Sequence, residues 1–186
     1  MDRPNIPAPR MVMSTIAKRF LLPHCHPLTV NLVQGVDVHI QTADVEWRPG
    51  DVPVSTRFDD PYFSLENGLA ETRHVFLHAN GLPGRLCDGF TVAELGFGTG
   101  LNFLATLQMW EASRDAGRLH FTSFEAFPMS VTDMGRALAG FDGAGLRTNE
   151  LVAAWRPDGG VFEIFPGVRL EVIVGDARQT VPRWSG

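Results

Sequence analysis

The sequence of 186 residues has few of the features that mark secreted, membrane or nucleic-acid-binding proteins. Its only cysteines, Cys25 and Cys87, lie far apart and are expected to be free thiols. No apolar run approaches the roughly 18 residues that a membrane span needs, and the start lacks the apolar segment of a secretory signal. A net charge of −5 does not favour binding of nucleic-acid phosphates without a local basic patch or a partner. We therefore expect a cytoplasmic protein with a single core.

A metal site is also not predicted. Cys25 lies between His24 and His26, but the flanking Pro23 and Pro27 break the segment. No second pair of ligands follows at the spacing of a structural metal site.

The N-terminal part of the chain has a mixed pattern. Residues 1–27 contain five prolines and are expected to form an irregular extension, although residues 10–22 could form a short amphipathic helix. Residues 28–33 and 36–40 alternate between apolar and polar side chains, which favours strands. Residues 43–64 are rich in turn-forming residues and carry aromatic side chains, as functional loops often do. A domain boundary is therefore predicted at residue 27, with one domain over residues 28–186.

From residue 64 onward, helices and strands alternate in the manner of an α/β protein. Ser64 is expected to cap a helix that ends near Asn80 and Gly81. Further helices are expected from Gly100 to about residue 114, from Ser130 to about residue 139, and over residues 149–155 and 179–184. Apolar runs predict core strands over residues 90–95, 119–125 and 168–174, with a hairpin arm at 161–165.

A strand, a glycine-rich turn and a helix start at residues 91–103 are the centre of this pattern. Gly96, Gly98 and Gly100 allow positive φ angles and let a ligand approach the backbone closely. The spacing is E-x-G-x-G-x-G, which differs from the G-x-G-x-x-G pattern of dinucleotide sites, and Glu94 precedes the turn. An acid there suits S-adenosylmethionine, which has an ammonium group, a sulfur cation and no phosphate. A nicotinamide cofactor and a purely structural turn are the alternatives.

Three acids stand at or near the ends of successive predicted strands: Glu94, Glu125 and Asp176. In an open α/β sheet, ligands bind at this edge. Glu125 could accept both hydroxyls of a ribose. Asp176 could accept from an adenine amino group, while the backbone at Ala177 could donate to a ring nitrogen. The three acids and the glycine turn together favour S-adenosylmethionine over a nicotinamide cofactor.

With these motifs, the sequence resembles the methyltransferase domain of the MnmC family over about residues 44–184. The resemblance is carried by Y-F-S at 62–64, G-L-x-E-x-x-x-V-F-L at 68–77, G-F-G-T-G-L-N-F-L at 96–104 and S-F-E-A-F-P at 123–128. It implies methyl transfer from S-adenosylmethionine to the aminomethyl nitrogen of 5-aminomethyl-(2-thio)uridine at the tRNA wobble position. It also implies tRNA as the substrate and an FAD-dependent oxidoreductase domain, fused or separate, as a partner.

The resemblance extends the set of site residues. It implies a methionyl-side pocket that includes Phe97 and Asn102 beside Glu94 and the glycines. It also implies that four further residues lie beside the cofactor or substrate: Tyr62, Phe63, Asn67 and Glu71.

One departure from the family pattern affects the expected activity. The family has a further strand and an Asp-Gly-Phe-x-Pro loop facing the reacting amine, which we expect beyond Gly186, so no catalytic base is named. We expect the N-terminal half of a class I, Rossmann-like methyltransferase sheet, in which the first strand lacks the neighbour that would cover its edge. Impaired turnover is the consequence. The alternatives are a noncatalytic or defunct S-adenosylmethionine-binding fragment and a small-molecule N-methyltransferase.

Overall fold

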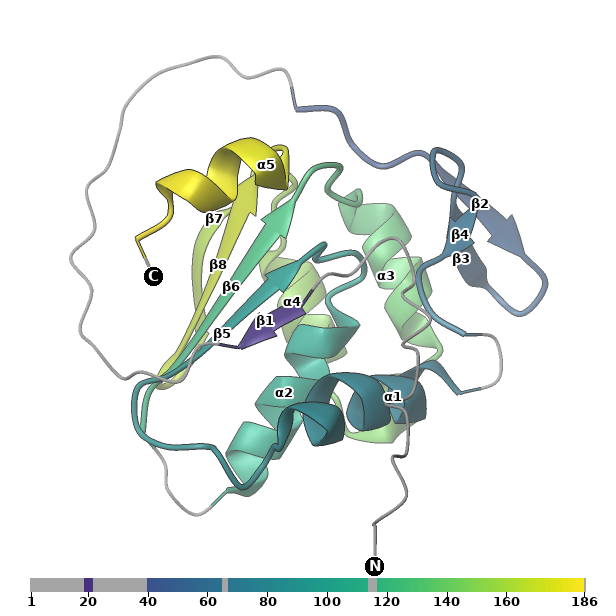
Figure 1. The fold of residues 1–186 in the computed structure, drawn as a ribbon. Coiled ribbons are helices and arrows are strands. Elements are labelled where there is room, and N and C mark those ends of the chain that lie inside the picture. The colour runs from purple at the N-terminus through teal and green to yellow at the C-terminus, as the bar shows by residue number, and fades with distance from the viewer. Residues whose placement is uncertain (1–18, 22–39, 65–66, 114–116, 186) are drawn as a thin grey trace, which may run out of the picture.

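The centre of the molecule is a five-stranded mixed sheet with strand order β1-β5-β6-β8-β7 (Figure 1). The computed structural model describes residues 19–21, 40–64, 67–113 and 117–185. β5, β6 and β8 are parallel, while β1 and β7 run antiparallel to their neighbours. The three core strands and the hairpin arm predicted from the sequence are therefore confirmed. The strands of this sheet are β1 (Arg19–Leu21), β5 (Phe90–Leu95), β6 (Leu119–Glu125), β7 (Gly160–Phe165) and β8 (Val168–Val174).

Helices cover one face of this sheet and form the main core with it. Phe103 of α2 packs edge-on against Phe121 of β6, with ring centroids 5.3 Å apart, and Phe76 approaches the same ring at 6.3 Å. All three side chains are almost completely buried. The segments in this layer are α1 (Gly68–Glu71), a π-helical turn (Thr72–Leu77), a 3-10 turn (His78–Asn80), α2 (Leu101–Ala112), α3 (Val131–Ala139), a second 3-10 turn (Asp142–Ala144) and α4 (Thr148–Ala154).

The sequence predicted most of these helix ends. Gly81 adopts a φ of 74° and ends the first helical segment, and Ser130 accepts a hydrogen bond from the Asp133 backbone N–H at the start of α3. The predicted cap at Ser64 is wrong, because Asn67 is the N-cap of α1. A β-carbon on Gly68 would lie 2.9 Å from Phe63 Cβ, so the start of α1 lies directly against Phe63.

On the opposite face, the C-terminal segment lies against β6. Trp184 packs edge-on against Phe124, with centroids 5.5 Å apart. Because Phe121 and Phe124 are three residues apart on one strand, their side chains point to opposite faces. The segment comprises α5 (Ala177–Thr180) and a 3-10 turn (Val181–Arg183), which together correspond to the helix predicted over residues 179–184.

A small antiparallel sheet replaces the loop predicted over residues 43–64. Its strands are β2 (Val45–Arg48), β3 (Val52–Ser55) and β4 (Asp60–Pro61). The prediction was wrong because the strands are only two to four residues long and two of them contain proline, which argues against a strand. In Figure 1 this sheet lies beyond α3, on the side to which β5 and β6 point. The Ala43 N–H donates to Pro128 O at 2.9 Å and so connects the start of this segment to the loop after β6.

The edge of β5 is also covered, in contrast to the expectation from the sequence. β1 pairs antiparallel with β5, from Arg19 opposite Glu94 to Leu21 opposite Val92. These three residues are a strand and not part of the helix predicted over 10–22, because their conformation is set by pairing with a distant strand. The strands predicted at 28–33 and 36–40 lie outside the described residues, apart from Ile40, which is not in a strand. The domain boundary at residue 27 stays a prediction.

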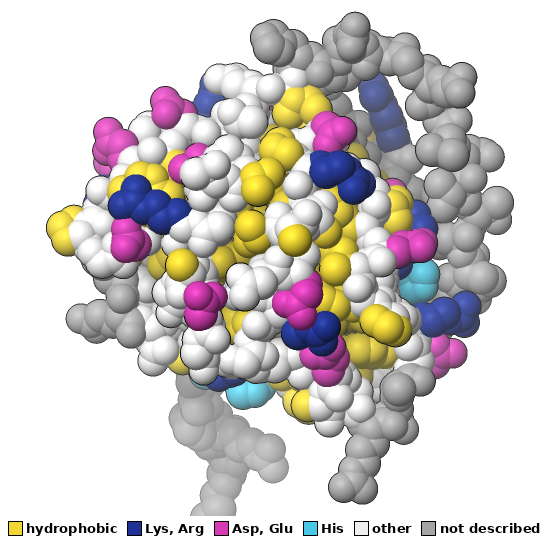
Figure 2. Space-filling view, turned by 180° about the vertical axis from the view of Figure 1, so that it is seen from behind, with side chains coloured by type: hydrophobic (Ala, Val, Ile, Leu, Met, Phe, Trp, Pro, Cys, Tyr) yellow, Lys and Arg dark blue, Asp and Glu magenta, His cyan; other side chains and the backbone are white. Residues whose placement is uncertain are grey.

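Acidic and basic side chains alternate on the surface shown in Figure 2, where several dark blue groups lie next to magenta ones. This face therefore carries no large patch of one sign. Among the described residues, Arg147 pairs with Glu111 at 2.9 Å and with Glu150 at 2.5 Å. Within the described part of the chain, no helix has the length and apolar character to cross a bilayer.

Candidate functional site

The three predicted acids lie on adjacent strands at one edge of the large sheet. Glu94 is the penultimate residue of β5, Glu125 ends β6, and Asp176 follows β8 by two residues. Backbone hydrogen bonds extend beyond the strand ends: the Gly96 N–H donates to Phe124 O and the Gly175 N–H donates to Glu125 O, both at 2.8 Å. The carboxyl ends of β5, β6 and β8 therefore form one continuous edge.

The glycine turn at this edge has the predicted backbone conformation. Gly96, Gly98 and Gly100 have φ angles of 85°, 55° and 78°, a region that side-chain-bearing residues seldom occupy. Gly100 is also confined by packing, since a β-carbon there would lie 2.8 Å from Leu151 Cδ2 and 3.0 Å from Phe97 Cζ. The turn thus requires glycine for both its conformation and its contacts.

Glu125 connects the glycine turn to the loop after β6. Its Oε2 accepts a hydrogen bond from the Gly98 N–H at 3.0 Å, and its Oε1 accepts one from the Phe127 N–H at 2.8 Å. The side chain is largely buried, with 8% of its surface exposed. A carboxylate has about four acceptor positions, so two more donors could still be accommodated.

Glu94 lies deeper, between β5 and the first turn of α2. It is 1% exposed, and its Oε2 accepts from Asn102 Nδ2 at 3.1 Å. A buried carboxylate next to a positive-φ turn and a helix start can accept from a cationic ligand group. Glu94 and Asn102, which the resemblance assigns to one pocket, are therefore in direct contact, and their role at the methionyl end of a cofactor stays a prediction.

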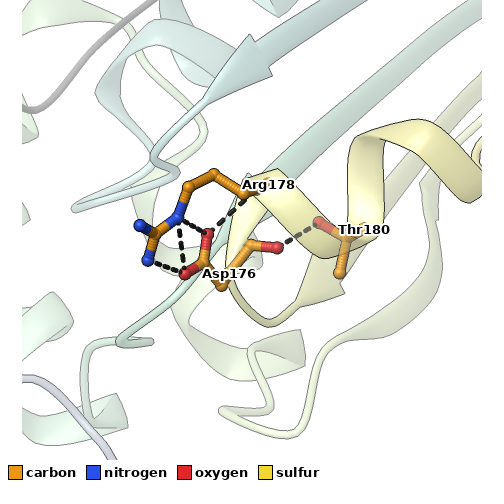
Figure 3. A network of polar contacts seen from close by, with 3 residues as sticks. All are labelled: Asp176, Arg178 and Thr180. Carbon is orange, nitrogen blue, oxygen red and sulfur yellow. Dashed lines mark hydrogen bonds and ion pairs between the residues drawn. The ribbon is translucent and has the colours of Figure 1, made fainter.

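Asp176 is engaged by its own neighbour (Figure 3). It is the N-cap of α5, and its side chain accepts from the Arg178 backbone N–H at 2.9 Å. The Arg178 guanidinium also donates to both carboxylate oxygens. Hydrogen bonds from Arg178 are the main reason why the pKa of Asp176 falls to about 2. Ala177 follows as the first residue of α5 and is half-buried.

Among the residues that the resemblance implies for the substrate side, Tyr62 lies at the glycine turn. A β-carbon on Gly98 would lie 3.1 Å from Tyr62 Cδ1, so the ring covers the turn. Burial raises the pKa of Tyr62 to about 12, the charge of Glu125 adds to this effect, and a hydrogen bond with Ser55 opposes it. Tyr62, Gly98 and Glu125 thus form one group.

The other residues of that set make different contacts. Phe63 packs edge-on against Phe141 at 5.2 Å and, together with Asn67, lines a cavity of about 290 Å³ between the turn after β2, the start of α1 and the end of α3. Glu71 is exposed, and its backbone N–H donates to Asn67 O. Their predicted role beside the cofactor or substrate stays a prediction.

Phe97 points into the core. It is 2% exposed and stacks on Trp155, with centroids 4.9 Å apart and planes tilted by 15°. The Trp155 Nε1–H donates to Met129 O at 2.8 Å. Only the backbone of Phe97 is therefore placed to meet a ligand at the turn.

One feature of this edge was missed at the level of sequence, namely Arg178, for which the acid two residues earlier was a signal. A second feature, the exposed turn at residues 56–59, belongs to the segment 43–64 that the sequence indicated as a functional loop. Its Phe58 is 49% exposed and approaches Phe127 at 6.1 Å. The Arg57 guanidinium lies 4.1 Å from the centroid of the Phe127 ring. This turn lies over the loop that begins at Glu125.

The strand order, the glycine turn and the acids at the strand ends define a Rossmann-like α/β sheet, the fold class predicted from the sequence. The solved structure of MnmC2 from Aquifex aeolicus has the same type of fold, with a TM-score of 0.52 and 18% identity over 80% of this chain and 47% of that one. No model of a protein family matches the chain.

The chain is homologous to part of the MnmC proteins. It is 42% identical over 153 residues to the tRNA 5-methylaminomethyl-2-thiouridine biosynthesis bifunctional protein MnmC of Aeromonas salmonicida, a match covering 76% of this chain and 23% of that protein. The protein of the same name from Acinetobacter baylyi is 42% identical over 161 residues, or 79% of this chain and 26% of that protein. These matches confirm the resemblance predicted from the sequence. The chain spans about a quarter of the length of these relatives.

Proposed function

We propose that this chain binds S-adenosylmethionine at the carboxyl edge of β5, β6 and β8. The observation that carries the proposal is the hydrogen bond from the Gly98 N–H to Glu125. It brings a carboxylate that could accept the ribose hydroxyls next to a turn whose backbone a ligand can approach. Such a pairing of an acid with a glycine turn is the arrangement by which α/β sheets hold nucleosides.

The hydrogen-bonding capacity of the three acids fits this cofactor. Glu94, Glu125 and Asp176 are acceptor-only when ionised, and S-adenosylmethionine offers an ammonium group, two ribose hydroxyls and an adenine amino group. Glu125 retains acceptor capacity beside its two protein donors. Asp176 already accepts from Arg178, so an adenine amino group would compete with Arg178 for this carboxylate.

The substrate we propose is the wobble uridine of tRNA, with transfer of a methyl group to the aminomethyl nitrogen of 5-aminomethyl-(2-thio)uridine. The relatives are named for tRNA 5-methylaminomethyl-2-thiouridine biosynthesis, and this supports the assignment. The exposed turn at 56–59 adds support, since exposed aromatic and arginine side chains can stack on unpaired bases. A tRNA substrate would place the protein in the cytoplasm.

When bound, the cofactor would supply a methyl group activated by a positively charged sulfur. The residues described here would act by binding and orientation: Glu125 would hold the ribose, Glu94 and Asn102 would accept the methionyl end, and Tyr62 would cover the turn. Alignment of this kind can lower a displacement barrier by about 7 to 11 kcal/mol.

Calorimetry with S-adenosylmethionine tests the cofactor assignment. We expect saturable binding to the chain that falls at least tenfold in Glu125→Gln and is unchanged in Glu163→Gln, whose side chain is exposed on β7. Absence of binding by the wild-type chain, with circular dichroism showing that it is folded, would contradict the proposal.

The methyl acceptor is tested separately with tritiated cofactor and tRNA that ends in the 5-aminomethyl group. We expect slow incorporation of label into this tRNA and none into tRNA that lacks the aminomethyl group. Cofactor binding without transfer would indicate a noncatalytic binder. Transfer to free amines and not to tRNA would indicate a small-molecule N-methyltransferase.

A further inference from the structure

The Asp176 carboxylate is engaged at both oxygens by one neighbouring residue (Figure 3). Oδ1 accepts from the Arg178 backbone N–H at 2.9 Å and from Nε at 3.0 Å. Oδ2 accepts from Nε at 3.0 Å and from Nη2. The Nε–H is shared between the two oxygens, so Arg178 supplies three donors to a carboxylate that offers about four acceptor positions. A ligand amino group would therefore compete with Arg178 for this carboxylate.

The Arg178 side chain is the part that can leave. The backbone of Asp176 is held by the Gln179 and Thr180 N–H groups, which donate to its carbonyl at 2.8 and 3.0 Å, and Gly175 is bonded to Glu125 O. The side chain of Arg178 is 88% exposed, compared with 36% for Asp176. Removal of the guanidinium would leave the N-cap hydrogen bond from the Arg178 backbone in place.

We propose that Arg178 competes with the adenine amino group for Asp176 and so limits cofactor affinity. This inference rests on the proposed function. Binding exchanges a charged donor for a neutral one and returns the guanidinium to solvent. Because exposed ion pairs are weakened by salt, the competition should decrease as ionic strength rises. Arg178 thereby becomes a specificity-determining residue at the adenine end of the site.

The test is calorimetry of the 186-residue chain with S-adenosylhomocysteine and with its 6-oxo analogue, S-inosylhomocysteine. Arg178→Gln should bind the adenine ligand about two- to fivefold more tightly than wild type, since exposed ion pairs of this type contribute little more than that factor. The 6-oxo analogue has no amino group to donate to Asp176, so its affinity should not increase. Arg178→Lys keeps the positive charge but not the planar guanidinium, so its affinity for the adenine ligand should lie between those of wild type and Arg178→Gln.

Two controls test whether the effect comes from the interaction between Asp176 and Arg178. Arg183→Gln removes another exposed arginine, which forms no ion pair with the described residues, and should not change affinity. In an Asp176→Asn background, Arg178→Gln should have no further effect, because the two changes act on one interaction. Raising the salt concentration should strengthen adenine binding by wild type more than by Arg178→Gln.

Each outcome decides the proposal. Unchanged or weaker binding by Arg178→Gln would overturn it while leaving the cofactor site in place. Equal gains for the adenine and 6-oxo ligands would also overturn it, by showing that Arg178 acts on the ligand through general charge. If the folded wild-type chain binds neither ligand, the proposed function itself fails, and this inference fails with it.

Discussion

Tyr62 provides a direct test of the site, because it is the only tyrosine in the sequence. The ultraviolet absorbance of tyrosinate therefore reports this one side chain. Burial, with a contribution from the charge of Glu125, raises its pKa from 10.0 to about 12. At about pH 11, roughly nine tenths of an unperturbed tyrosine would be ionised, whereas only about one tenth of Tyr62 should be. We expect this difference in a rapid pH jump, read before the chain unfolds.

Two substitutions divide the shift among its causes. Glu125→Gln removes the charge and should lower the pKa of Tyr62, although not to 10, because burial is the larger cause. Ser55→Ala removes a hydrogen bond that lowers the pKa, so this variant should show a higher value. Opposite shifts in the two variants would confirm that Tyr62, Ser55 and Glu125 lie together.

The raised pKa of Tyr62 also predicts how the stability of the fold changes with pH. The folded-state pKa of Tyr62 lies above the unfolded value, so its contribution to stability is fully present below about pH 10 and is lost as the pH rises through about 12. Alkaline unfolding followed by tryptophan fluorescence should therefore begin at higher pH in Tyr62→Phe. A wild-type titration midpoint near 10, with the chain still folded, would refute the placement of Tyr62 against the glycine turn.

Three further predictions test neighbouring parts of the molecule. Gly100→Ala should destabilise the chain by about 1 to 3 kcal/mol in urea unfolding, because it forces an alanine into a positive φ angle and against packed side chains. Arg178→Gln should raise the pKa of Asp176 from about 2 toward 3.8 in a carboxyl NMR titration, so that the stability which wild type has above the unfolded pKa and loses as the pH falls through the folded pKa is largely absent in the variant. Trp155→Phe should cost about 1 to 3 kcal/mol, because it leaves the buried Met129 carbonyl without the indole donor; an unchanged urea midpoint would contradict this.

The central α/β unit could be predicted because its signals are local. The strand at 119–125 is apolar on both faces, as expected for a strand buried between layers, and it agrees with β6 to the residue. The glycine spacing likewise specified the positive φ angles of the turn. In these segments, local preference and tertiary packing favour the same conformation.

The segments that were mispredicted depend on contacts distant in sequence. β1 is a strand because β5 offers an open edge some 70 residues later, and nothing within residues 19–21 indicates this. The small sheet of β2, β3 and β4 is held by the three-residue turn after β2, where Gly50 and Asp51 have φ angles of 85° and 56°. Strands of two to four residues are too short for their hydrophobic pattern to distinguish them from loops.

At the site, the sequence predicted where the acids lie but not which hydrogen bonds their carboxylates accept. The sequence placed Glu94, Glu125 and Asp176 at one edge because each acid stands at or near the end of an apolar strand, and the backbone hydrogen bonds of the Gly96 and Gly175 N–H groups account for their alignment. What the sequence could not specify is how far each carboxylate is already engaged. Glu125 accepts two backbone donors and retains capacity, whereas Asp176 accepts four contacts from Arg178. Since both residues were assigned to one ligand, the adenine end should be the part of the site that limits affinity, and the ribose end the part that is ready to bind.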